Sequence, residues 1–229
     1  MEINETPREI VDTQTDLSKF QSIETSDSAF RGSIESFVNE IRDIFKPEEL
    51  PIEARDYGVE ACTDCAKDCF TPEVINEWPT MTLEERNEVI QSYAAGIGKG
   101  LDINFEGVIW EEFPIEDGAY TFGYNQGDGF LHLNVDMLCD PSYLMQVIST
   151  VAHEARHQFQ VEAIENPEKY NIDDATLKEW EVAQAIYTLD QPSAYDPWGY
   201  TFNPLEIDSR YFGETVVREL TKDLISNIA

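Results

Sequence analysis

The chain has few basic residues and very little histidine. Its 229 residues include 15 Lys and Arg against 46 Asp and Glu, so the formal net charge is -31, with a pI near 4.1. A surface of this charge repels phosphate backbones, which argues against nucleic acid as a partner. It would attract cationic groups instead, so a basic peptide is compatible with it. The simpler interpretation is that the acidity serves solubility or a salty environment.

Long apolar runs are also missing. No stretch approaches eighteen consecutive apolar residues, so we expect no transmembrane helix and no membrane partner. Residues 1–16 are polar and acidic, and they lack the basic and then apolar order of a secretory signal. A cytoplasmic protein is the expectation, with export by a signal-independent route left open.

The remaining composition suits a folded domain with a proper core, since 41% of the residues are hydrophobic and 11% aromatic. We expect residues 1–26 to form a flexible acidic arm, because they are rich in Glu, Asp, Thr, Ser and Gln. The apolar stripe in residues 27–50 predicts an amphipathic helix that docks on its own domain. Residues 51–229 then form the main domain.

Helices make up most of that domain. Thr82 and Glu85 have the spacing of a capping box and predict a helix to about residue 97, where Gly96, Gly98 and Gly100 break the pattern. A further helix is expected at residues 173–189.

The sheet is expected to be small. Runs of β-forming residues predict strands at residues 108–110, 119–124 and 130–135, and the turn-forming residues 125–129 join the last two as a hairpin. The predicted fold class is therefore α+β, mainly helical, with a small antiparallel or mixed sheet beside a helix predicted at residues 141–165.

Four cysteines allow three interpretations. Cys62, Cys65 and Cys69 are spaced i, i+3 and i+7, which places them on one face of a helix. They could pack as small core side chains, form a disulfide, or bind a metal with Cys139 as the fourth ligand. We favour the core, because the spacing matches no strong zinc-ribbon pattern.

Two of the three histidines occur together in His153-Glu154-Ala155-Arg156-His157. The surrounding apolar residues predict a long helix from Pro141 to Glu165, and on a helix positions i and i+4 share one face. Both imidazoles can therefore reach one metal ion, and Glu154 stands where a carboxylate can deprotonate a metal-activated water. The alternative is a polar cluster with no metal.

A catalytic zinc ion needs a third protein ligand, because three ligands and a water are its usual set. The best candidate is Glu206 in Asn203-Pro204-Leu205-Glu206-Ile207-Asp208. Pro204 can open a helix, and a carboxylate in its first turn could point across a cleft at the histidines.

The combination of His153-Glu154-x-x-His157 with Glu206 on a second helix resembles the gluzincin clan of zinc metallopeptidases. The two segments also resemble a group of small, little-characterised bacterial and phage-associated metallopeptidases. The resemblance covers roughly residues 78–220 and implies a zincin-like fold and Zn²⁺-dependent hydrolysis, without naming a substrate. In that clan a small residue and then Asp or Asn often follow the downstream glutamate at the third and fourth positions. Ser209 fits the first, but Arg210 departs from the second, and whether Asp208 substitutes for it stays open.

We therefore expect a zinc metallopeptidase that cleaves peptides or proteins, and the acidic surface is compatible with basic ones. His153, His157 and Glu206 would hold Zn²⁺, and Glu154 would act as the general base. A donor to the oxyanion is also needed, and the sequence does not choose among Tyr211, Tyr200, Arg210 and His132. His132 is better explained as an ordinary strand histidine. Two alternatives are a catalytically inactive zincin-fold binding module and a structural zinc protein.

Overall fold

The structure is a computed structural model that describes residues 56–114, 120–190 and 202–228. The predicted arm (residues 1–26) and amphipathic helix (residues 27–50) lie outside this range. Within it, helices predominate and a small sheet lies to one side of them, which agrees with the predicted α+β class. The helices are α3 (Val59–Cys69), α4 (Pro72–Glu77), α5 (Leu83–Leu101), α6 (Asp136–Cys139), α7 (Leu144–Glu165), α8 (Pro167–Tyr170), α9 (Asp174–Asp190) and α11 (Pro204–Ile228).

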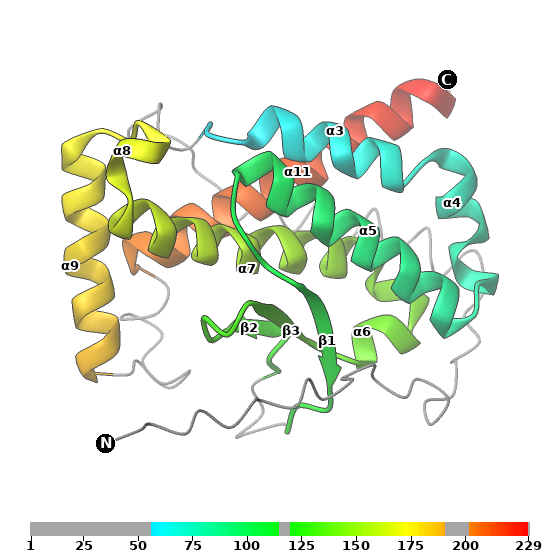
Figure 1. Cartoon of the computed structure of the whole chain (residues 1–229). Coiled ribbons are helices and arrows are strands. Elements are labelled where there is room, and N and C mark those ends of the chain that lie inside the picture. The colour runs from blue at the N-terminus through cyan, green and yellow to red at the C-terminus, as the bar shows by residue number, and fades with distance from the viewer. Residues whose placement is uncertain (1–55, 115–119, 191–201, 229) are drawn as a thin grey trace, which may run out of the picture.

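Helix α7 lies at the centre, with α11 alongside it, α3 and α5 above it and the sheet below it in Figure 1. Its start follows the predicted signals, since the Asp140 side chain accepts a 2.8 Å bond from the backbone of Ser142. Pro141 lies in a short 3₁₀ turn (Pro141–Tyr143), and the α-helix begins directly after it. The apolar stripe of α7 is buried as predicted, and the partner of that stripe includes α11.

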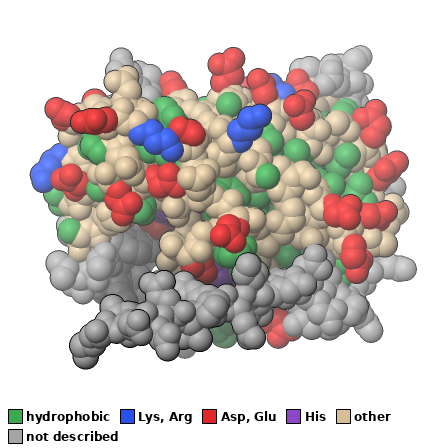
Figure 2. All heavy atoms as spheres, in the orientation of Figure 1, with side chains coloured by type: hydrophobic (Ala, Val, Ile, Leu, Met, Phe, Trp, Pro, Cys, Tyr) green, Lys and Arg blue, Asp and Glu red, His purple; other side chains and the backbone are tan. Residues whose placement is uncertain are grey.

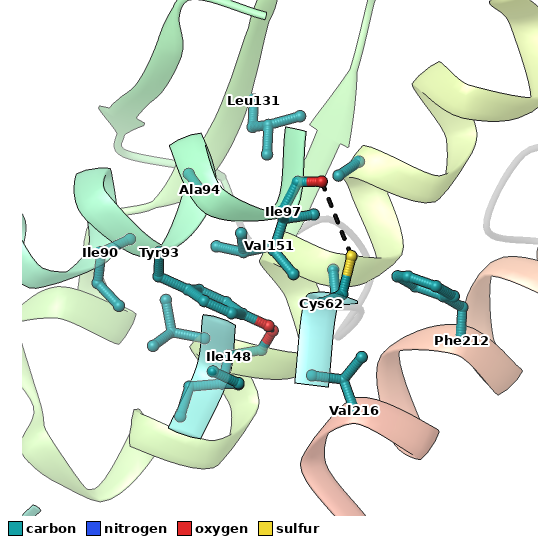
Figure 3. Close-up of a cluster of buried hydrophobic side chains, with 14 of the residues drawn as sticks. Cys62, Ile90, Tyr93, Ala94, Ile97, Leu131, Ile148, Val151, Phe212 and Val216 are labelled. Carbon is teal, nitrogen blue, oxygen red and sulfur yellow. Dashed lines mark hydrogen bonds between the residues drawn. The ribbon is translucent and has the colours of Figure 1, made fainter. Parts of the chain in front are cut away.

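The core joins α3, α5, α7 and α11 (Figure 3). Tyr93 of α5 is fully buried, and its hydroxyl donates a 3.2 Å bond to the carbonyl oxygen of Ile148 in α7. The Cys62 thiol contacts the carbonyl oxygen of Ile97 at 3.7 Å. The Tyr93 hydroxyl and the Cys62 thiol therefore each find an acceptor on a neighbouring helix.

Helix α5 has the predicted capping box, with the Thr82 side chain accepting from the Glu85 backbone and the Glu85 side chain accepting from the Thr82 backbone. The predicted end was wrong, because the helix continues through its glycines to Leu101. An added Cβ at Gly96 would lie 2.0 Å from the Cys65 sulfur, and one at Gly100 would lie 2.8 Å from the Cys62 sulfur. These glycines therefore let α3 approach α5 closely, and that packing outweighs their low helix propensity.

The cysteines behave mainly as core residues. All four are free thiols; Cys62 and Cys139 are buried, while Cys65 and Cys69 are partly buried against the core. Within the described part of the chain, no cysteine belongs to a group of three potential metal ligands. The core interpretation is the one that the structure supports.

The described sheet is mixed, with strand order β1-β3-β2. Strands β1 (Gly107–Glu111) and β3 (Phe130–Asn134) are parallel, while β2 (Gly123–Asn125) and β3 form the predicted antiparallel hairpin. The expected strand at residues 119–124 is shorter than predicted, because regular pairing begins only at Gly123.

The two edges of the sheet differ. On β1, the Gln91 side chain bonds to both the N–H and the carbonyl of Val108, at 2.9 and 2.7 Å, as a neighbouring strand would. Strand β2 pairs with β3 and lies over α7, where the Asn125 amide donates to the Glu154 carbonyl at 3.3 Å. The β2 edge is thus held directly beside the motif helix.

None of the described helices is long and apolar enough to cross a membrane.

Candidate metal centre

His153 and His157 meet on one face of α7, as their spacing predicts. Their Nε2 atoms lie 3.1 Å apart, with the two rings nearly perpendicular at 82°. Glu154 lies beside them, and one donor atom from each of the three residues falls within 4.8 Å of the others. His153, Glu154 and His157 therefore form a group that could hold a metal ion.

Glu206 approaches the same pair from the first turn of α11, where Pro204 opens the helix. Its Oε2 lies 3.4 Å from the Nε2 of His153, and its Oε1 lies 3.4 Å from the Nε2 of His157. The side chain is buried, and Oε2 has no hydrogen-bond partner. A buried carboxylate oxygen without a donor is costly unless a cation faces it.

The charges in this cluster depend on one another. Burial alone would raise the pKa of Glu206, but its contacts with both imidazoles hold that pKa well below its usual range. Burial likewise opposes the charged form of His157, yet the bond and charge of Glu206 outweigh it and raise the pKa of His157 to about 9. The pocket therefore favours a positive charge between the imidazoles and Glu206.

The spacing of these donors fits a small divalent ion. Nitrogen and oxygen ligands about 2.0–2.1 Å from zinc in a tetrahedral site are about 3.3–3.4 Å from one another. The two imidazole nitrogens are 3.1 Å apart, and each lies 3.4 Å from Glu206, His153 facing Oε2 and His157 facing Oε1. The group whose donor atoms all lie within 4.8 Å of one another comprises His153, Glu154 and His157, and Glu206 adds a carboxylate from the second helix.

Glu154 is a second buried carboxylate in the cluster. Burial raises its pKa, the two histidines lower it, and the charge of Glu206 raises it further. A carboxylate made more basic in this way is a better proton acceptor than an exposed one.

A buried set of polar residues supports His157 from behind, and the sequence reasoning had singled out only part of it. The Nδ1 of His157 lies 3.0 Å from Gln160 Oε1 and 3.2 Å from Ser209 Oγ. Gln160 Nε2 donates to Asp208 at 2.7 Å, and Asp208 pairs with the buried Arg156. Asp208 thus takes a supporting position that Arg210 does not. The available signal was Arg156 itself, a charged residue within a helix expected to be buried.

A cleft of about 470 Å³ opens over this cluster, between β2, α7 and the start of α11. Apart from Glu154, His157 and Glu206, its described lining is neutral. The other lining residues are Gly123, Tyr124, Asn125, Gln126, Gly127, Gln158, Gln160, Val161, Ile164, Gln184 and Leu205. A larger hollow of about 760 Å³ lies between α3, α4 and α5, but no histidine lines it, so the smaller cleft is the better candidate.

The structure distinguishes among the four proposed oxyanion donors. The ring of His132 is buried, and its two nitrogens lie 3.0 Å from Glu111 and 3.1 Å from Asp128, which agrees with a structural strand histidine. In the described lining of the cleft, His132, Arg210 and Tyr211 are all absent. Tyr200 lies outside the described residues.

No known family model, curated protein or solved structure matches this chain.

Proposed function

We propose that the protein is a zinc-dependent hydrolase, and specifically a peptidase. In this proposal His153, His157 and Glu206 hold the zinc ion, and Glu154 is the general base. The observation that carries it is the convergence of two imidazoles and one orphaned, buried carboxylate at 3.1–3.4 Å from two separate helices.

Zinc in such a site lowers the pKa of a water towards about 7 and polarises a carbonyl group. Glu154 is placed to take up the proton of the attacking water and to pass it to the leaving amine. Its burial supports this role, since burial raises the pKa of its carboxylate.

The neighbouring strand supports a peptide substrate. Strand β2 forms one wall of the cleft, and Asn125 fastens it to α7 through bonds to the Glu154 carbonyl and the Gln158 side chain, both at 3.3 Å. An extended peptide can add to a strand edge through main-chain hydrogen bonds, which require no particular side chain. On the β1 edge, Gln91 already occupies the main-chain groups of Val108, and β1 does not line the cleft, so β2 is the better platform.

The charge of the molecule favours neutral or basic substrates. Carboxylates are scattered over the visible face of the described part, with fewer Lys or Arg side chains among them (Figure 2). No Lys or Arg belongs to the described lining of the cleft, so an acidic substrate side chain would find no counter-ion there.

The test is cleavage of a mixed peptide library by the purified protein, loaded with zinc and then treated with a chelator. We expect cleavage that stops on chelation and returns with zinc. Glu154→Gln should bind zinc normally and cleave at least a hundredfold more slowly, because the ligands remain but the proton acceptor is lost. Glu165→Gln, an exposed change on the same helix, is the matched control and should cleave normally.

Two other results would redirect the proposal. Tight zinc binding without any cleavage would favour a structural zinc protein, with Glu154 closing the coordination from its position near both imidazoles. Absence of both zinc binding and cleavage would favour an inactive binding module. Normal cleavage by Glu154→Gln would show that Glu154 is not the base.

A further inference from the structure

The buried polar residues behind His157 form a continuous series from Arg156 through Asp208 and Gln160 to the imidazole. At each contact, the residue that donates and the residue that accepts are determined by the contact before it. Glutamine amide orientation and histidine tautomer cannot be taken from atom positions alone, but the partners here determine both.

Arg156 fixes the charge of Asp208. Its guanidinium donates to the two carboxylate oxygens at 2.8 and 3.2 Å. Both side chains are buried, so water does not compete for the pair. The cation also lies 4.4 Å from the Phe159 ring centroid and 5.0 Å from that of Phe212. A guanidinium remains protonated, so Asp208 stays a carboxylate and can only accept hydrogen bonds.

Asp208 then fixes the orientation of the Gln160 amide. One end of that amide lies 2.7 Å from Asp208 Oδ2 and 3.0 Å from the Leu205 carbonyl oxygen. Both partners only accept, so this end must be the NH₂ group. The opposite end, which faces His157, is therefore the oxygen.

Gln160 in turn fixes the tautomer of His157. The amide oxygen lies 3.0 Å from Nδ1 and can only accept, so Nδ1 must carry a hydrogen. Ser209 is compatible, because its hydroxyl can donate to Gln160 Oε1 at 3.4 Å and direct a lone pair at Nδ1. In a neutral imidazole this leaves the lone pair on Nε2, the atom that faces His153 and Glu206.

We infer that Gln160 is a positioning residue that, held by Asp208 and Arg156, presents Nε2 of His157 to the metal ion. The inference rests on the proposed zinc site. In this chain the Gln160 amide lies between the Asp208 carboxylate and His157, so the carboxylate does not contact the imidazole directly. Partners of this kind orient a ligand and raise metal affinity by about 10–100-fold.

The first test is zinc affinity, measured by competition with a chromogenic chelator. Gln160→Met keeps the side-chain length but removes the acceptor, so we expect zinc binding to weaken by about 10–100-fold. The matched control is Gln146→Met, the same change on α7 at a residue that bonds only to Thr150 among its described partners; its affinity should be unchanged. Wild-type affinity in Gln160→Met would overturn the inference.

The second test does not need zinc. The chain has three histidines, so the imidazole region of a ¹⁵N-edited NMR spectrum is simple. The metal-free protein should show a slowly exchanging Nδ1–H on His157. This proton should be lost in Gln160→Met, which removes the amide oxygen that accepts it, and retained in the Gln146→Met control. Absence of the protected proton in the wild-type protein overturns the inference, even if zinc binds.

These measurements separate the two proposals. A wild-type protein with the protected proton and no zinc binding would support the contact and contradict the zinc centre. Zinc binding without the protected proton would support the centre and contradict the role of Gln160. If Gln160→Met fails to fold, as judged by circular dichroism, the wild-type spectrum still decides the question, because the protected Nδ1–H is either present or absent in it.

Discussion

Gly213 of α11 lies against the backbone of Ser149 in α7. An added Cβ at Gly213 would be 2.7 Å from the Ser149 carbonyl oxygen and 3.5 Å from the Cβ of His153. The absence of a side chain here lets the two helices approach closely, one turn from a candidate metal ligand. Two turns earlier on α11, Glu206 benefits from the same approach.

Gly213→Ala should therefore destabilise the protein even though alanine favours helix. The contact with a backbone oxygen cannot be relieved by rotating a side chain, and overpacking of this kind costs about 1–3 kcal/mol. The gain in helix propensity is about 1 kcal/mol or less. We expect a lower melting temperature together with weaker zinc binding. An unchanged melting temperature would show that the close approach carries no strain.

Glu214, the next residue on α11, predicts a pH-dependent stability. Its Oε2 is buried without a hydrogen-bond partner, and burial raises its pKa to about 7 against the opposing influence of Arg210 and Arg218. The folded protein thus holds this proton more tightly than the unfolded chain does. The contribution of the protonated Glu214 carboxyl group to the free energy of unfolding is fully present below about pH 4.5. It is lost as the pH rises through about 7.

Glu214→Gln should remove that loss and stabilise the protein at pH 8, by on the order of 3 kcal/mol at most. Near pH 4 the variant and the wild type should have similar stability. Glu219→Gln is the matched control, because Glu219 bonds to Lys222 at 2.7 Å and its pKa is lowered by that contact. Urea titrations at the two pH values measure the difference. Equal effects of Glu214→Gln at both would contradict the assignment.

Local patterns were enough to predict the motif helix and the placement of His153, His157 and Glu206 near one another. His153 and His157 share a face because of the helical period, and Pro204 places Glu206 in a first turn; each signal involves only a few neighbouring residues. The capping box at Thr82 and the hairpin after Gly123 were predictable for the same reason.

Long-range contacts were not predictable in this way. Gly96 and Gly100 were expected to end α5, because the cysteines of α3 that fill the space beside them are distant in sequence. The Asp208–Arg156 pair joins residues 52 positions apart, so the supporting role of Asp208 was left open. The parallel pairing of β1 with β3 likewise joins residues 23 positions apart, such as Gly107 and Phe130, which no local pattern records.

Asn125 should affect substrate binding more than chemistry. Its amide holds β2 to α7 with two bonds of 3.3 Å, and its Oδ1 accepts from Gly127 at 2.8 Å. Each bond contributes about 0.5–1.5 kcal/mol, so Asn125→Ala should raise KM for peptides several-fold to about tenfold. Steady-state kinetics would check this, with kcat staying within about twofold. A fall in kcat at constant KM would argue against β2 as the binding edge.

Zinc should stabilise the fold, because the unfolded chain lacks the three converging ligands. At a free zinc concentration one hundred times Kd the gain is about 2.7 kcal/mol. For a chain of this length that corresponds to an increase of about 5–10 °C in melting temperature. Thermal unfolding with and without chelator measures it, and identical curves would show that zinc does not bind the folded site.

Zinc content of purified Glu206→Ala, compared with the wild type and with Glu219→Ala as a partly exposed control on the same helix, tests the central claim most directly. We predict one zinc per chain in the wild type and control and a large loss of zinc in Glu206→Ala, because its carboxylate faces both imidazoles at 3.4 Å. An unchanged zinc content in Glu206→Ala would contradict the claim that α7 and α11 together form the metal centre.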